Sequence, residues 1–182
     1  MKKYKRSPWG IVQYQEQIDS LMVSVSTASH GGVKVMPKFN KLIPQELRNQ
    51  GGWYEEDCEY SIPFYFLYHW ISKENREDRE EYLKVLKNYF PFKLEACLNI
   101  DIKPGESAIK DEYIFKNENQ NKWISFSNLC IINNVKSWLH KQSTKEEICV
   151  MISKDIYESH KTRYGCIFTD EQVMNFRKIS GF

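Results

Sequence analysis

Two polar segments in the N-terminal third of the sequence hold the side chains best suited to chemistry. Residues 24–32 read Ser-Val-Ser-Thr-Ala-Ser-His-Gly-Gly, and residues 51–57 read Gly-Gly-Trp-Tyr-Glu-Glu-Asp. An imidazole and several carboxylates are the groups that hold a divalent metal ion or act in general acid–base catalysis. The candidate metal ligands are His30, Glu55, Glu56 and Asp57. His30 and Glu56 are also the candidate catalytic residues of such a site.

The hydroxyls and glycines of the same segments suggest a second chemistry, the binding of an anion. Hydroxyl groups and exposed backbone N–H groups at a bend make a concavity for a phosphate, and neighbouring aromatic rings offer a surface for a base. The candidate ligand-binding residues are Ser26, Thr27, Ser29, His30, Gly31, Gly32, Trp53 and Tyr54. A serine nucleophile activated by His30 is a weaker alternative, because no Gly-x-Ser-x-Gly elbow is present.

A purely structural interpretation competes with both chemistries. The three acids precede an apolar run, 60–70, so they could stabilise the positive end of a helix dipole at its N-terminus. His30 would then only hydrogen-bond the backbone of its own turn. Under this interpretation the two segments need not meet.

Hydrophobic patterning predicts the elements that position these residues. Alternation over 11–14 and 21–27 predicts a β-hairpin around Asp19-Ser20, and Val33 and Val35 predict a third strand. Helical spacing over 82–90 and the apolar run before it predict helices packed against this sheet. The predicted fold is therefore a single α+β domain over 1–182, with an N-terminal antiparallel sheet and residues 1–6 as a flexible arm.

The C-terminal half is predicted to add further strand–helix units. Residues 129–139 fit either a strand or a helix, and the helix is preferred. Strands are expected over 148–152 and 165–168, with a helix over 154–162 between them. Thr169 and Gln172 have the spacing of a capping box at the start of a last helix to Lys178.

Composition narrows the class of protein. The chain has 182 residues with 26 Lys and Arg against 24 Asp and Glu, a net charge of +2, so the charge balance does not indicate a nucleic-acid-binding surface, although a local basic patch stays open. The five cysteines are irregularly spaced, as in a reduced cytoplasmic protein. No apolar run is long enough to span a bilayer, so no membrane partner is expected. A homo-oligomer is left open.

The order of several short motifs resembles an uncharacterised family of bacteriophage and mobile-element proteins. The motifs are Ser7-Pro8-Trp9-Gly10, then Ser26-Thr27-Ala28-Ser29-His30-Gly31-Gly32, then Gly51-Gly52-Trp53-Tyr54-Glu55-Glu56-Asp57. The resemblance implies an accessory protein working in the cytoplasm of a bacterial host, and it implies no mechanism.

Two functions follow as hypotheses. The first is a non-enzymatic anti-defence protein, an inhibitor that binds a host immune component or its nucleotide-type signal; it rests on that resemblance and on the lack of a complete catalytic motif. The alternative is a metal-dependent hydrolase of nucleotides or nucleic acid that uses the cluster of His30, Glu55, Glu56 and Asp57. The cofactor is unknown in the first case and a divalent metal in the second.

Overall fold

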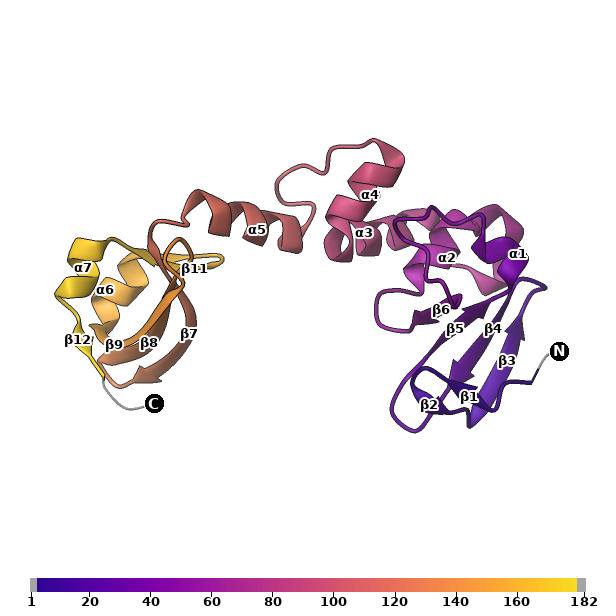
Figure 1. Cartoon of the computed structure of the whole chain (residues 1–182), viewed down its shortest axis with the longest axis horizontal. Helices are drawn as coiled ribbons and strands as arrows, with labels where there is room; N and C mark the ends of the chain where they lie inside the picture. The colour runs from indigo at the N-terminus through magenta and orange to yellow at the C-terminus, as the bar shows by residue number, and fades with distance from the viewer. Residues whose placement is uncertain (1–2, 180–182) are drawn as a thin grey trace. The chain divides into compact units, whose positions relative to one another are not determined.

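The computed structural model describes residues 3–179, which form helices and antiparallel sheets and confirm the α+β class (Figure 1). The chain divides into two compact units, Met1–Lys110 and Asp111–Phe182. Within the described residues each unit has a hydrophobic cluster of its own. The single-domain organisation over 1–182 therefore stays a prediction. No helix of residues 3–179 is long and apolar enough to cross a bilayer.

The N-terminal unit is built on a four-stranded antiparallel sheet in the order β3-β4-β5-β6. Its strands are β3 (Tyr14–Ile18), β4 (Met22–Ser26), β5 (Gly31–Val35) and β6 (Trp53–Glu55). The hairpin around Asp19-Ser20 and the third strand are confirmed, but the first strand covers Tyr14–Ile18 and not the predicted 11–14. Asp19 takes a left-handed conformation (φ 51°) in the turn. Sequence reasoning missed β6, which pairs with β5 across a long connection.

A short ribbon precedes the sheet. It consists of β1 (Arg6–Ser7) and β2 (Gly10–Ile11), with Trp9 at its turn in edge-to-face contact with Trp53, ring centroids 5.9 Å apart. Within the predicted arm 1–6, Tyr4 contacts the same indole at 5.2 Å, and residues 1–2 lie outside the described part of the chain. Aromatic contacts thus dock residues 4–11 on the unit.

Helices supply the rest of the N-terminal core. They are α1 (Pro37–Asn40), α2 (Ser61–Phe66), the 3-10 turns η1 (Tyr68–Trp70) and η2 (Lys73–Asn75), α3 (Arg79–Tyr89) and α4 (Pro91–Leu98). The next helix, α5 (Ala108–Glu118), has no buried residue and belongs to the C-terminal unit from Asp111 onward. Buried residues of the sheet, among them Met22, Val35 and Tyr54, pack with Ile62 of α2 and Leu86 of α3. The sheet is therefore covered by helices on the face that carries these side chains.

The C-terminal unit has a six-stranded sheet in the order β10-β11-β7-β8-β9-β12. The strands are β7 (Trp123–Ile131), β8 (Asn134–Lys141), β9 (Glu146–Ser153), β10 (Lys161–Thr162), β11 (Gly165–Phe168) and β12 (Arg177–Lys178), with helices α6 (Lys154–Ser159) and α7 (Asp170–Met174). Val135, Leu139, Val150 and Phe168 lie in its core.

Three local predictions for this half can be compared with the structure. The capping box of Thr169 and Gln172 is confirmed, but α7 ends at Met174 and β12 follows. The preference for a helix over 129–139 was wrong, because these residues form the β7–β8 hairpin. Its turn places Ile132 at φ 47°, a conformation that an isoleucine rarely adopts and that local sequence does not signal.

Candidate functional site

The turn between β4 and β5 presents His30 at one end of the N-terminal sheet. The Thr27 hydroxyl donates to the His30 carbonyl oxygen at 2.8 Å and accepts from the His30 N–H at 3.2 Å. The backbone N–H of Thr27 also donates to the His30 carbonyl oxygen, at 2.8 Å. The hydroxyl of Thr27 therefore holds the turn, and the imidazole, whose side chain is 56% exposed, extends from it.

Strand β6 brings two carboxylates to the same end of the sheet. Glu55 lies opposite Gly32 in the β5–β6 register, and the Glu56 N–H donates to the Gly31 carbonyl oxygen at 3.2 Å. A Cβ on Gly31 would clash with Glu56 Oε2 and lie 3.0 Å from the Val25 carbonyl oxygen. Gly31 thus lets the Glu56 carboxylate lie directly against the strand.

His30, Glu55 and Glu56 form a constellation of metal-ligand type. One ligand atom from each lies within 4.8 Å of the others, and His30 Nδ1 is 4.0 Å from Glu55 Oε1. Atoms bound to one ion at about 2.0–2.2 Å lie roughly 3–4.4 Å apart, so closing the site requires a movement of about 1 Å or less. His30 and Glu56 are exposed, which leaves their side chains free to make that adjustment.

Glu55 is held in place by its neighbours. Its Oε2 atom accepts from the Asp57 N–H at 2.8 Å, which leaves Oε1 directed to His30. The Glu55 N–H in turn donates to Glu59 Oε2 at 3.2 Å. Hydrogen bonds of this kind orient a ligating carboxylate before an ion arrives. The side chain of Asp57, the fourth candidate ligand, is not part of the constellation.

The interpretation of the acids as a helix cap was wrong. Glu55 ends β6, the next helix α2 begins at Ser61, and its first turn contains no acidic residue. The long-range pairing of β6 with β5 overrides the local pattern of acids before an apolar run. The pairing of β6 in the sheet therefore positions these carboxylates, and they do not cap a helix.

Two aromatic residues predicted to bind a ligand, Trp53 and Tyr54, pack against other parts of the N-terminal unit. Tyr54 is fully buried, donates to Asn40 Oδ1 at 2.7 Å, and has its pKa raised to about 12 by burial. Trp53 contacts Trp9 and lies under the Lys34 ammonium, 5.0 Å from the ring centroid. The structure therefore places Tyr54 in the core and Trp53 at the junction with the β1–β2 ribbon.

A cleft with a volume of about 290 Å³ adjoins the constellation, with Glu56 belonging to both. Its lining also includes the hydroxyl residues Ser24 and Ser26 of β4 and the rings of Tyr60 and Phe64. Sequence reasoning pointed to the serines and missed the two rings, which follow β6 in the chain and looked like core residues alone. The cleft therefore combines hydroxyls, aromatic surface and a carboxylate beside the candidate metal ligands.

The thiol closest to this region is unsuited to ligation. Burial, and then the charges of Glu59, Glu55 and Asp57, raise the pKa of Cys58. Because the thiolate is the metal-binding form, Cys58 remains a protonated neighbour at neutral pH. The ligand set consists of one imidazole and two carboxylates.

With the geometry established, comparison with known proteins places the chain in a family. The sequence pattern of a family described as a domain of unknown function (DUF7007) matches residues 2–120. The chain belongs to this family. The DUF7007 match contains His30, Glu55, Glu56 and the adjoining cleft, whereas β7 to β12 lie outside it. No curated protein and no solved structure matches the chain.

Proposed function

We propose that the DUF7007 region is a metal-dependent hydrolase acting on a phosphate ester of nucleotide type. The observation that carries the proposal is the convergence of His30, Glu55 and Glu56 within 4.8 Å. Structural metal sites surround their ion with four protein ligands, whereas catalytic sites supply three and keep a position for water or substrate. A three-ligand set at the surface beside a cleft fits the second kind.

The proposed chemistry is the addition of water to phosphorus. A bound ion would polarise the phosphoryl oxygen and lower the pKa of water, so that hydroxide forms near neutral pH. The new bond joins the water oxygen to phosphorus, the ester P–O bond breaks, and the leaving oxygen takes up a proton. Glu56 lines the cleft, and its carboxylate oxygen that does not bind the ion is proposed to accept the proton of the water and pass it to the leaving oxygen.

The cleft supports a substrate of limited size. About 290 Å³ is at the lower end of the range for small-molecule sites, which suits one nucleotide better than a polymer. The Tyr60 and Phe64 rings could contact a base, and the Ser24 and Ser26 hydroxyls could donate to phosphate oxygens. Two carboxylates near the phosphate would repel it, which makes substrate binding depend on the ion.

The test is turnover by the full chain with Mn²⁺, Mg²⁺ or Zn²⁺, using bis-p-nitrophenyl phosphate and a panel of linear and cyclic nucleotides. Loss of turnover in His30→Ala and Glu56→Gln, but not in the matched neighbour Asp57→Asn, is the expected result. Equal turnover in all four proteins would show that the constellation is not the active centre.

A second proposal is a protein that binds its target and catalyses no reaction. In this account the protein is a cytoplasmic accessory factor of a phage or mobile element that sequesters a host nucleotide signal, or binds a host defence protein, without cleaving anything. The motif resemblance to phage and mobile-element proteins favours it. Ion-dependent nucleotide binding without turnover would support sequestration, and binding of neither ion nor nucleotide would leave only a protein target.

A further inference from the structure

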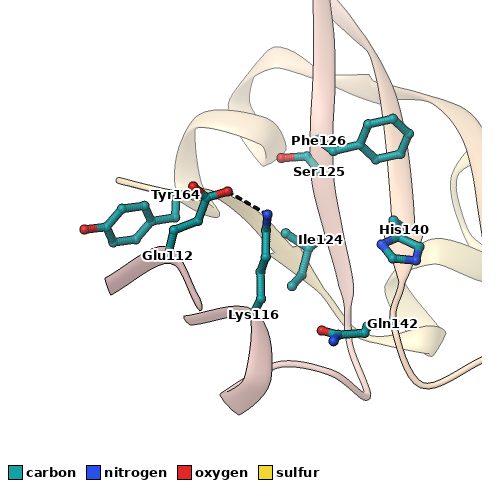
Figure 2. A pocket seen from close by; sticks show the side chains of 8 residues that line it. All are labelled: Glu112, Lys116, Ile124, Ser125, Phe126, His140, Gln142 and Tyr164. Carbon is teal, nitrogen blue, oxygen red and sulfur yellow. Dashed lines mark ion pairs between the residues drawn. The ribbon is translucent and has the colours of Figure 1, made fainter. Parts of the chain in front are cut away.

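The C-terminal unit contains a pocket that none of the preceding chemistry uses. It has a volume of about 460 Å³, within the range of small-molecule sites. Its lining residues are Glu112, Lys116, Ile124, Ser125, Phe126, His140, Gln142 and Tyr164 (Figure 2). They come from α5, β7, the end of β8 and the β10–β11 turn, so the pocket is formed entirely within this unit.

A β-bulge places a large aromatic ring at the pocket. In the β7–β8 register Ser125 lies opposite Leu139 and Ser127 opposite Trp138, which leaves Phe126 as the extra residue. A bulge redirects the side chain of its extra residue and is frequent beside functional sites. Phe126 is 56% exposed, although the same strand begins with the buried residues Trp123 and Ile124. The bulge therefore holds an apolar ring in contact with water.

A glycine brings the opposite wall close to the bulge. Gly165 has φ +131°, and a Cβ there would lie 2.7 Å from the Ser125 carbonyl oxygen. The Cys166 N–H donates to Ser125 Oγ at 2.7 Å, which fixes this approach. Tyr164 then lies beside α5, with a hydrogen bond of 3.2 Å from its hydroxyl to Asp111. The pocket thus depends on two special backbone features, the bulge at Phe126 and the glycine at Gly165.

The polar groups of the pocket are balanced in charge. Lys116 and Glu112 form an ion pair of 2.6 Å, and Figure 2 shows this pair on one side of Ile124, with Phe126 and His140 on the other. Gln142 adds an amide that can both donate and accept. The His140 ring meets Phe126 edge to face, with centroids 6.5 Å apart. The arrangement offers a ring face, an apolar floor and hydrogen-bonding groups with no net charge from the ion pair.

We propose that this pocket binds a nucleobase, stacked on Phe126 and hydrogen-bonded by Gln142 and the Glu112–Lys116 pair. A flat, uncharged heteroaromatic ring with mixed donors and acceptors on its edge is the ligand that these groups complement. A phosphate adds little affinity, because Lys116 is already paired. The base reaches the pocket as a nucleoside, as a mononucleotide or as part of a single strand.

The test is calorimetric titration of the full chain, in the presence of EDTA, with the four common ribonucleosides, their monophosphates and a mixed-sequence single-stranded octanucleotide. EDTA removes any contribution of the ion proposed for His30, so failure here and failure of the hydrolase proposal are distinguishable. We expect a nucleoside and its monophosphate to bind with similar affinity. Tighter binding of the octanucleotide would identify a single strand as the source of the base.

Substitutions in β7 test whether the ligand binds at Phe126. Phe126→Ala should weaken binding about tenfold or more, which is within the effect of losing one stacking platform. Leu129→Ala is the matched control, since Leu129 lies on the same strand, is 54% exposed and does not line the pocket. Phe126→Tyr, which retains the ring, should bind as wild type. The proposal is overturned if no nucleoside, nucleotide or oligonucleotide binds, or if Phe126→Ala binds as tightly as Leu129→Ala.

Discussion

Replacing Gly31 by alanine should weaken metal binding without removing any ligand. Gly31 lies in β5, and the added methyl group would occupy the position of Glu56 Oε2. The new Cβ would also lie 3.0 Å from the Val25 carbonyl oxygen, so the backbone leaves it little room. The Glu56 carboxylate must therefore leave its present position, in which His30, Glu55 and Glu56 have ligand atoms within 4.8 Å of one another.

The two consequences of this substitution differ in size. Displacing an oriented ligand lowers metal affinity by about 10–100-fold, or roughly 1.4–2.7 kcal/mol. The unfolding free energy of the metal-free protein should change by about 1 kcal/mol or less, because alanine restricts the unfolded chain and so offsets part of the new close contact. The substitution should therefore change metal affinity much more than it changes the free energy of unfolding.

The assay is calorimetric titration with Mn²⁺, accompanied by urea unfolding of the metal-free proteins. Gly51→Ala is the control, since a Cβ there would meet only Trp53 Cδ1, at 3.3 Å. It should bind Mn²⁺ as wild type does. Wild-type affinity in Gly31→Ala would refute the assignment of Glu56 as a ligand from its present position.

Other expected outcomes concern stability and pH. Tyr54→Phe should lower the free energy of unfolding in urea by about 1–3 kcal/mol. The reason is that the buried amide oxygen of Asn40 and the backbone N–H of Asn49 both lose the Tyr54 hydroxyl as their partner. Burial raises the pKa of Tyr54 from 10.0 to about 12. The stabilisation that comes from the neutral hydroxyl is therefore complete below pH 10 and is lost as pH rises toward 12. The unfolding free energy of Tyr54→Phe should not show this loss. The Lys141 ammonium, and then the Trp123 indole, lower the pKa of Asp170 below its usual 3.8. Asp170→Asn should therefore lower the unfolding free energy at pH 7. Its difference in unfolding free energy from wild type should shrink as pH falls below about 4. Urea unfolding at pH 7 and pH 3 measures the last effect, and an equal difference at both would contradict it.

Local patterns were sufficient for much of the fold. Alternating apolar residues identified β4 and the hairpin, and Val33 and Val35 identified β5. The capping box of Thr169 and Gln172 marked the start of α7, because both hydrogen bonds join residues three positions apart. Each of these signals lies within one element or one turn.

The missed features depend on partners distant in sequence. Strand β6 has only three residues, and its identity follows from pairing with β5 rather than from its own pattern. Acids that looked like the start of a helix therefore belong to a strand end. Likewise, residues 129–139 carry the spacing of either element, and pairing with β7 and β9 determines that they form strands.

The candidate site was foreseen in its residue types and missed in its geometry. His30, Glu55 and Glu56 were singled out by chemistry, but the sequence could not tell whether residues 25 positions or more apart converge. The sheet register supplies that convergence. Phe126 gave no signal at all, because a bulge and a strand interior look alike in one sequence.

The proposed function requires that His30, Glu55 and Glu56 together hold one divalent ion. Native mass spectrometry of the full chain with Mn²⁺ or Zn²⁺, compared with the denatured mass, tests it most directly. We expect one retained ion in wild type and in Asp57→Asn, and none in His30→Ala or Glu56→Gln. Absence of an ion from wild type, or the same retained ion in all four proteins, would contradict it.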